Sequence, residues 1–228
     1  MLLIFFKKFT EEKKLMTKSK GQTRKFYPRS IFTTNNAIWF EKRLKEKNKE
    51  FKTEIPVKFD INSTKKTIEW LKKQKLSWVV YQKEIDAAIK YNHYWASISN
   101  NGEIIGCIKI GFGNIYIFDY DKIIKFPDKM AFVYDTFVLD EYRNKGIAKY
   151  LISQTIKLLK SKGYERVGCH IPPWNKASIS AFEKNGFKKV SYIRYFRILS
   201  VPIRIVNSPD KSSIFNGGKV SHDELPYT

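Results

Sequence analysis

The chain has no long hydrophobic run. Its 228 residues contain no apolar stretch that approaches the roughly 20 residues needed to span a bilayer. The opening, MLLIFFKKF, has an apolar core too short for a secretory signal peptide, and no small-residue cleavage site follows it. We therefore expect a soluble, cytoplasmic protein.

Cysteine and histidine are scarce, with two and three residues respectively. Cys107 and Cys169 lie in apolar strand-like runs, where a free cysteine usually behaves as a small hydrophobic residue. A disulfide framework or a structural zinc site would require more cysteines at characteristic spacing. His93 and His222 have no ligand-like neighbours in the sequence, so we expect no metal site.

Acidic residues are few relative to basic ones. The chain has 43 Lys and Arg against 22 Asp and Glu, a formal net charge of +21. Such a charge favours polyanionic partners: nucleic acid, an anionic membrane or a phosphorylated cofactor. Lysine-rich, glycine-poor usage is also typical of an AT-rich genome, so composition supports this class of partner without naming one. We keep nucleic-acid contact as an expectation and leave homodimer formation open.

The sequence divides into three parts. Residues 1–52 predict a basic arm, in which residues 35–51 follow an Asn cap with a rough helical stripe and predict a helix. Residues 53–200 alternate between strand-like and helix-like segments and predict one α/β domain, for which a 43% hydrophobic composition supplies ample core material. Residues 201–228 show no sustained pattern and predict a loose tail.

The middle of the domain predicts a βαβ unit. Residues 130–138 are nearly all apolar, as in a strand buried on both faces; residues 146–163 have a helical apolar stripe, and residues 166–171 form the next strand-like run. Strands joined through a helix imply a mixed sheet. The other expected strands are 54–61 (at an edge), 94–99, 103–111, 114–118, 122–126 and 190–198, and the other expected helices are 65–74, 84–92 and 174–187.

Arg143, Gly146 and Ala148 form the pattern RxxGxA, directly after the buried strand and before the helix. A strand that turns sharply into a helix exposes backbone N–H groups that suit an anion. Gly146 leaves room for a phosphate to approach the backbone, and the small Ala148 does the same. The amides of residues 144–149 are therefore expected to face a pyrophosphate. By contrast, GFG at 111–113 lacks a third glycine and a following helix, and predicts a bend.

A second motif begins about 30 residues after the first. Residues 175–187, NKASISAFEKNGF, match the pattern N-x-x-[SA]-x-x-x-[YF]-x-x-x-G-F. The two motifs, in this order and separated by a strand, resemble the acetyl-coenzyme A (acetyl-CoA) binding region of the GCN5-related N-acetyltransferase (GNAT) family. The resemblance covers about residues 53–198. It implies the GNAT-like acyl-CoA N-acyltransferase fold, an α/β fold with a mixed, mostly antiparallel central sheet flanked by helices.

The resemblance implies that acetyl-CoA binds as a co-substrate between the two central strands. The backbone of residues 136–138 would pair with the pantetheine arm, Arg143 would brace the pyrophosphate loop, and Asn175 would hydrogen-bond the pantetheine. Lys145 and Lys149 could equally be solvated charges, and Asn175 could simply cap its helix. The implied cofactor-binding residues are Thr136, Phe137, Val138, Arg143, Asn144, Lys145, Gly146, Ile147, Ala148, Lys149, Asn175, Ser178 and Phe182.

Direct attack of a primary amine on a thioester requires a base, an oxyanion donor and a proton for the leaving thiolate. The resemblance assigns the oxyanion donor to the backbone N–H near Val138. The family commonly offers a tyrosine hydroxyl to the thiolate seven residues after the Asn, but this chain has Phe182 there. Since phenylalanine cannot donate a proton, water or another tyrosine must serve, or catalysis is weaker.

Three residues are candidates for the catalytic base. His170 lies five residues before Asn175, where some related enzymes carry an acidic base, although it could instead pack within its strand. Tyr134 and Asp135 lie on the buried strand before the loop, where an unpaired carboxylate would cost several kcal/mol. Strand alternation lets only one of these two face the acceptor, and we favour Asp135.

The motifs therefore predict an N-acetyltransferase that acts on a small amine, an amino sugar or a protein amino group. The positive charge gives an alternative, acylation of an RNA-bound target such as aminoacyl-tRNA or a ribosomal protein. Phe182 gives another, a catalytically weak module that binds acetyl-CoA as a sensor or scaffold. The acceptor stays open, because acceptor pockets in this fold come from its variable first helices and neighbouring loops.

Overall fold

A computed structural model of the chain describes residues 32–61, 64–74, 82–117, 122–198 and 201–207. The predicted arm up to residue 31 and the predicted tail from residue 208 lie outside the described residues. The strands are β1 (Phe32–Arg43), β2 (Lys58–Asp60), β3 (Tyr94–Asn100), β4 (Glu103–Phe112), β5 (Asn114–Ile117), β6 (Lys122–Lys125), β7 (Met130–Val138), β8 (Arg166–Ile171), β9 (Lys188–Ile198) and β10 (Val201–Asn207). The helices are α2 (Thr64–Lys73), α3 (Gln82–Lys90), α4 (Ile147–Ser161) and α5 (Lys176–Lys184), with a 3-10 turn η2 (Asp140–Tyr142).

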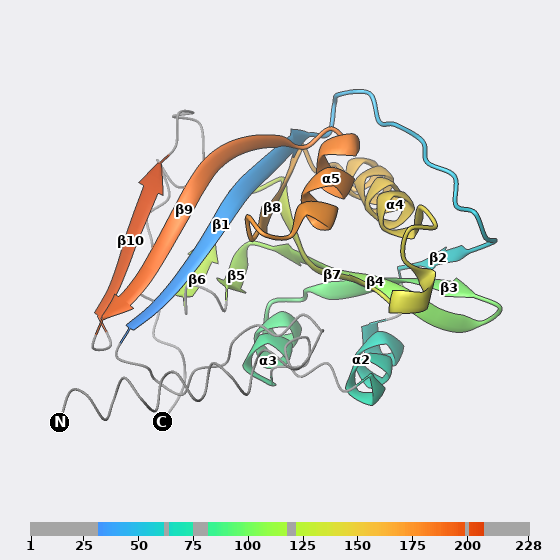
Figure 1. Cartoon of the computed structure of the whole chain (residues 1–228), viewed down its shortest axis with the longest axis horizontal. Coiled ribbons are helices and arrows are strands. Elements are labelled where there is room, and N and C mark those ends of the chain that lie inside the picture. Colours follow the sequence, from blue (N-terminus) through green and yellow to red (C-terminus); the bar gives the residue numbers. More distant parts are fainter. Residues whose placement is uncertain (1–31, 62–63, 75–81, 118–121, 199–200, 208–228) are drawn as a thin grey trace.

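The strands confirm a mixed, mostly antiparallel sheet (Figure 1). In the described part of the chain its order is β10-β9-β1-β8-β7-β4-β3-β2, and β5 and β6 pair as a separate two-stranded sheet. The β7–β8 pair is parallel and the other neighbours are antiparallel. The predicted βαβ unit is therefore confirmed as β7, α4 and β8. The strand predicted at an edge is also confirmed, as the short β2.

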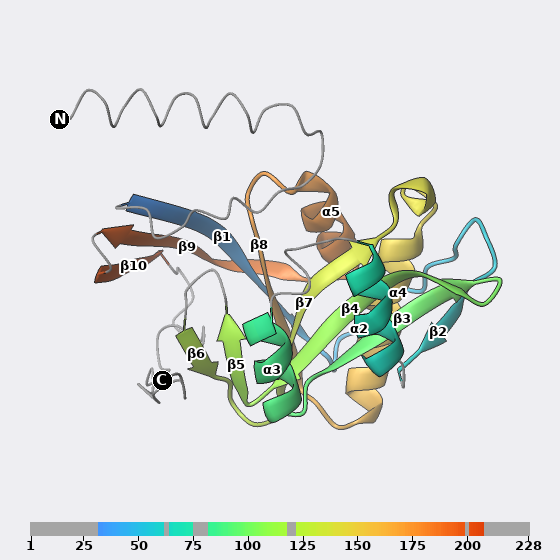
Figure 2. The ribbon, with the colours of Figure 1, turned by 90° about the horizontal axis from the view of Figure 1, so that it is seen from below.

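The predicted helix at residues 35–51 is wrong, because residues 32–43 form β1. This strand lies inside the sheet, antiparallel to both β8 and β9 (Figure 2). Trp39 packs on one face of the sheet and Phe40 on the other, with exposed fractions of 0% and 1%. A strand buried on both faces has a short continuous apolar run, which periodicity cannot distinguish from a helical stripe.

The described sheet therefore extends beyond residues 53–200 on both sides. At the N-terminal side it includes β1, and at the C-terminal side it includes β10, which pairs with β9 although it lies in the predicted loose tail. The chain before residue 53 thus supplies an internal strand of the same sheet that carries the two motifs.

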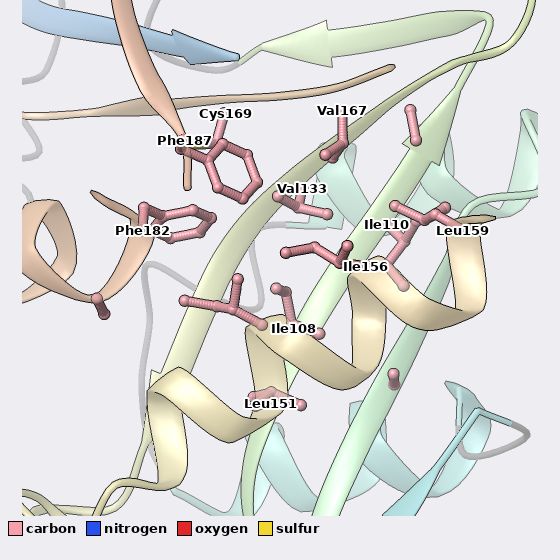
Figure 3. Packing of buried hydrophobic residues seen from close by; sticks show 14 of the residues in the cluster. Ile108, Ile110, Val133, Leu151, Ile156, Leu159, Val167, Cys169, Phe182 and Phe187 are labelled. Atoms are coloured by element: carbon pink, nitrogen blue, oxygen red, sulfur yellow. The ribbon is translucent and has the colours of Figure 1, made fainter. Parts of the chain in front are cut away.

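Helices cover both faces of the sheet (Figure 1). On one face α4 buries Leu151, Ile156 and Leu159 against β4 and β7, in the largest apolar cluster (Figure 3). On the opposite face α2 and α3 pack over a smaller cluster of Leu71, Ala88, Trp95, Cys107 and Phe137. None of the helices among the described residues is long and apolar enough to cross a membrane.

Candidate active site

The parallel strands β7 and β8 separate toward their C-terminal ends (Figure 2). They pair between residues 130–132 and 166–168, whereas β7 continues to Val138 and β8 to Ile171. Over its whole length β8 stays paired with β1 on its other side. We call this separation the splay. The carboxyl ends of parallel strands are the usual place for a ligand in an α/β sheet.

The backbone of Val138 faces the splay. The N–H of Leu139 donates to the carbonyl of Ile105 in β4 at 2.9 Å. Because neighbouring residues in a strand present their backbone groups to opposite sides, the N–H and C=O of Val138 point away from β4 and toward β8. The Val138 carbonyl accepts a hydrogen bond from Nε of Arg143 at 3.3 Å. Val138 therefore has the orientation that an oxyanion donor in the splay requires.

The loop between β7 and α4 alternates the sign of its φ angles. Arg143 has φ −70°, Asn144 +64° and Gly146 +78°, and the residue between the last two is not left-handed. These turns lead directly into the N-terminus of the 15-residue α4, where free backbone N–H groups and the positive end of the helix dipole favour an anion. Arg143 braces this loop through Val138 and through a 2.6 Å ion pair with Asp140. The loop is thus held in place directly before a helix N-terminus.

A segment far away in the sequence supports the loop. A Cβ added at Gly146 would lie 2.9 Å from the carbonyl oxygen of Lys52, and the N–H of Glu54 donates to the carbonyl of Lys145 at 3.2 Å. The β1–β2 connection therefore lies against the start of α4 (Figure 1). The RxxGxA pattern predicted a glycine at position 146 so that a phosphate could approach the backbone. The structure gives a second reason for this glycine, because the backbone of residue 52 leaves no room for a side chain.

Lys145 and Lys149 are half-buried beside the loop. Nζ of Lys145 lies 5.3 Å from the ring centroid of Tyr142, and Nζ of Lys149 lies 5.9 Å from that of Phe51. Cation–π attraction at these distances is modest, but it favours conformations in which both ammonium groups stay near the first turn of α4. Both ammonium groups therefore lie near the loop.

Asn175 caps α5, as the sequence allowed. Its Oδ1 accepts a hydrogen bond from the N–H of Ser178 at 3.1 Å. Phe182, in the third turn of the motif, belongs to the core: its ring meets that of Phe187 edge-on at 4.9 Å, and 3% of the residue is exposed. Burial and the missing hydroxyl both exclude Phe182 as a proton donor.

A β-bulge in β7 brings Tyr134 and Asp135 to one face of the sheet. Two residues of β7 oppose one of β4 between the pairs Cys107–Phe137 and Lys109–Tyr134, and Asp135 adopts φ +51°. The bulge interrupts the strand alternation, so both side chains contact Lys109. The expectation that only one of them faces the acceptor side is therefore wrong.

Lys109 is a buried charge that the sequence analysis did not single out. Its Nζ lies 3.4 Å from Oδ2 of Asp135, and each side chain is 1% exposed. The same Nζ lies 4.3 Å from the ring centroid of Tyr134 and 5.0 Å from that of Trp95. The carboxylate and the two rings offset the desolvation of the ammonium, and the ammonium in turn accounts for the burial of Asp135. The signal in the sequence was a lysine within the apolar run EIIGCIKIG.

His93 is hydrogen-bonded to Tyr134. Its Nδ1 lies 3.1 Å from the Tyr134 hydroxyl, and its Nε2 lies 3.1 Å from the Phe112 carbonyl oxygen. A carbonyl only accepts, so Nε2 carries the proton and the hydroxyl donates to Nδ1. Burial lowers the pKa of His93 to about 4, although the bond to Phe112 opposes the shift. The imidazole is therefore neutral at pH 7 and fixes the direction of the Tyr134 hydroxyl.

His170 lies on the same face as the other two candidate bases. Cys169 and Ile171 of β8 pack into the core beneath α4, so alternation directs His170 to the opposite face. The residue is partly exposed, its Nδ1 is buried, and its ring lies 5.5 Å from that of Phe132. The fold thus brings all three candidates to the face covered by α2 and α3. Among the described residues, no three His, Cys, Asp or Glu side chains are grouped to hold a metal ion.

A mixed, mostly antiparallel sheet whose parallel strands splay beside a strand–turn–helix loop is the architecture of the acyl-CoA N-acyltransferases. The chain belongs to the acetyltransferase (GNAT) family, because the model of that family matches residues 60–187, more than half of the chain. The chain is similar to the uncharacterized N-acetyltransferase YycN of Bacillus subtilis (strain 168), with 23% identity over 103 residues. The alignment covers 45% of this chain and 60% of YycN, so the chain spans about three fifths of that relative.

Solved structures of acetyltransferases are similar to parts of this chain. The GCN5-related glucosamine N-acetyltransferase region of a fungal multi-domain GH3 β-N-acetylglucosaminidase superposes with a TM-score of 0.50 at 13% identity, covering 72% of this chain and 21% of that one. A GNAT-family acetyltransferase from Novosphingobium aromaticivorans DSM 12444 gives a TM-score of 0.47 at 13% identity, covering 81% and 71%. At these identities the likeness concerns the fold alone and leaves the acceptor open.

Proposed function

We propose that the protein is an N-acetyltransferase that transfers the acetyl group of acetyl-CoA to a primary amine. The observation that carries this proposal is the loop of alternating φ angles at the N-terminus of α4, directly beside the splay of β7 and β8. The loop amides suit a pyrophosphate, and the splay leaves the end of β7 to pair with an extended pantetheine chain. Membership of the GNAT family supports the same co-substrate.

Each part of the co-substrate has a counterpart in the chain. The backbone of residues 136–138 would pair with the pantetheine, and the amides of residues 144–149 would hold the pyrophosphate. Lys145 and Lys149 would add charge to the phosphate contacts. Asn175 caps α5 through Oδ1, so its Nδ2 is the group that we assign to a pantetheine carbonyl.

We assign the general base to His170. Asp135 is buried in an ion pair and Tyr134 donates its proton to His93, whereas His170 is partly exposed on the same face. Its Nδ1 is buried, so Nε2 is the nitrogen that we assign to proton transfer. The base removes a proton from the ammonium, and the amine then attacks the thioester carbon. The N–H of Val138 stabilises the oxyanion, and the attacking nitrogen loses its second proton to water. The C–S bond then breaks to leave the amide, and the thiolate takes a proton from water.

The co-substrate assignment predicts a charge effect at Asn144. This exposed residue has φ +64°, a conformation that Asn, Asp and Gly all tolerate, so Asn144→Asp adds one negative charge with little strain. We expect calorimetric titration to give micromolar binding of acetyl-CoA by the native chain and about 10-fold weaker binding by Asn144→Asp, a loss of about 1.4 kcal/mol. Asn144→Gly, which removes the side chain without adding charge, is the matched control. A folded native chain that binds no acetyl-CoA at millimolar ligand would contradict the proposal.

The base assignment predicts a loss of turnover without a loss of binding. His170→Gln is expected to lower kcat about 100-fold, the lower range for general-base catalysis, and to leave the Kd for acetyl-CoA unchanged. Thiol release would be followed with a panel of glucosamine, a diamine and short peptides with free amino termini. Tyr134→Phe keeps the ring that faces Lys109 and is the control. If Tyr134→Phe loses turnover and His170→Gln retains it, the base is Tyr134.

Phe182 favours a second candidate, a catalytically weak module that binds acetyl-CoA as a sensor or scaffold. The residue occupies the position of the usual proton donor and lies in the core. Binding of acetyl-CoA without turnover on every amine of the panel would support this function. The alternative function, acylation of an RNA-bound target, would require a surface of this protein that binds nucleic acid.

A further inference from the structure

One exposed row of side chains on β9 combines an aromatic ring with two cations. The ring centroid of Tyr192 lies 5.9 Å from Nζ of Lys189 and 5.5 Å from Cζ of Arg194. Tyr192 is half-exposed and both cations are exposed. Tyr192 is the pairing partner of Ile38, which packs into the core beneath α4, so the row lies on that face of the sheet.

A group of lysines lies next to this row, where β1, α4 and β9 meet. Lys42 is buried, with 3% exposure. Burial lowers the pKa of Lys42, and the carboxylate of Glu46 partly opposes this shift. The positive charges of Lys188, Lys160 and Lys49 lower the pKa further. The carboxylate of Glu46 lies 3.8 Å from Nζ of Lys188. Four lysines around one glutamate leave this region with an excess of positive charge.

The two features meet at the start of β9. Lys189 pairs with Phe40, and Lys42 lies two residues after Phe40 in β1, so strand alternation directs Lys42 and Lys189 to the same face of the sheet. The charge of Lys188 acts on Lys42, which places its ammonium in the same region. We call the combined region the basic β9 surface. Phosphate groups are attracted by such charge, and a partly exposed ring beside cations offers a stacking platform to an unpaired base. Membrane insertion would need an apolar anchor, but the large hydrophobic residues that are exposed in the described part, Ile89 and Trp174, lie on α3 and between β8 and α5.

We propose that the basic β9 surface binds single-stranded nucleic acid. Backbone phosphates would contact Lys188, Lys189 and Arg194, and one base would stack on Tyr192. The proposal is independent of the acetyl-transfer function, because none of these residues belongs to the acetyl-CoA site. Its test is done without acetyl-CoA, so failure here leaves the proposed enzyme activity untouched.

The first test is fluorescence anisotropy of the full chain with labelled single-stranded RNA and, in parallel, single-stranded DNA, over a range of salt concentrations. The triple variant Lys188→Gln, Lys189→Gln, Arg194→Gln is expected to bind at least about 10-fold more weakly. Its plot of log K against log salt should be shallower by about 2, because each phosphate contact on a single strand contributes about 0.7.

The matched control removes the same charge from another exposed surface, with Lys65→Gln, Lys66→Gln and Lys72→Gln in α2. In this variant the slope of log K against log salt is expected to stay within about 0.5 of the native value, and most of the affinity is expected to remain. Equal losses in the two triple variants would overturn the proposal in favour of a non-specific effect of net charge. Thermal unfolding by circular dichroism checks that each variant is folded.

The second test separates stacking from charge. Tyr192→Leu is expected to weaken binding by about 5- to 150-fold, the range for one base–aromatic stack, whereas Tyr192→Phe keeps near-native affinity. An unchanged affinity in Tyr192→Leu would overturn the stacking contact. Binding to phosphatidylserine vesicles with none to RNA or DNA would overturn the proposal as a whole and assign the surface to anionic membranes.

Discussion

A chain that begins at residue 53 is expected to remain unfolded, whereas a chain that begins at residue 30 is expected to keep the fold. The reason is the position of β1, which joins β8 to β9 inside the sheet. Without it, β9 and β10 lose their connection to the other strands, and the buried side chains of Trp39 and Phe40 are removed. Loss of one buried aromatic side chain costs about 3–5 kcal/mol, against a total stability of about 5–15 kcal/mol for a typical domain.

The measurement is thermal unfolding by circular dichroism together with an amide NMR spectrum of each chain. A chain that ends at residue 200 is the matched control, since it removes β10, an edge strand, and should still unfold cooperatively. A synthetic peptide of residues 30–52, added to the chain that begins at residue 53, is expected to restore structure. Cooperative unfolding of that shorter chain alone, near the native temperature, would show that β1 is dispensable.

The comparison of sequence and fold shows why β1 escaped the pattern analysis. Segments that face solvent on one side, such as α4, have an apolar period that identifies them. In β1 the run AIWF is buried on both faces, so no period is left to distinguish strand from helix. Its location between β8 and β9 depends on pairing across more than 100 residues, which no local pattern records.

The candidate site also has one part that the sequence predicts and another part that it does not. The loop with Arg143 and Gly146 was predictable, because strand, turn and helix are consecutive in the sequence. The support from Lys52, the bulge at Asp135 and the burial of Lys109 were not, because each depends on a neighbour from another element. Local patterns thus predicted the loop before α4, whereas the surroundings of Asp135 and Lys109 required the tertiary fold.

Asp135→Asn is expected to destabilise the protein by about 3 kcal/mol, because it leaves the ammonium of Lys109 buried without its carboxylate. Asparagine is a suitable replacement, since Asp135 has φ +51° and Asn tolerates this conformation. The double variant Lys109→Met, Asp135→Asn should recover most of the loss. Methionine has a volume similar to the lysine stem, and its sulfur packs well against the rings of Tyr134 and Trp95.

Urea unfolding of the native chain, both single variants and the double variant gives the coupling energy of the pair. A single variant within about 0.5 kcal/mol of the native chain would mean that water reaches the pair and that the charges are not desolvated. The same four proteins decide what Asp135 does in catalysis. If its carboxylate only balances Lys109, the double variant is stable and keeps its kcat, as the assignment of the base to His170 requires. If Asp135 is the base, the double variant is equally stable but loses turnover, because neither the asparagine nor the methionine side chain can accept a proton from the amine.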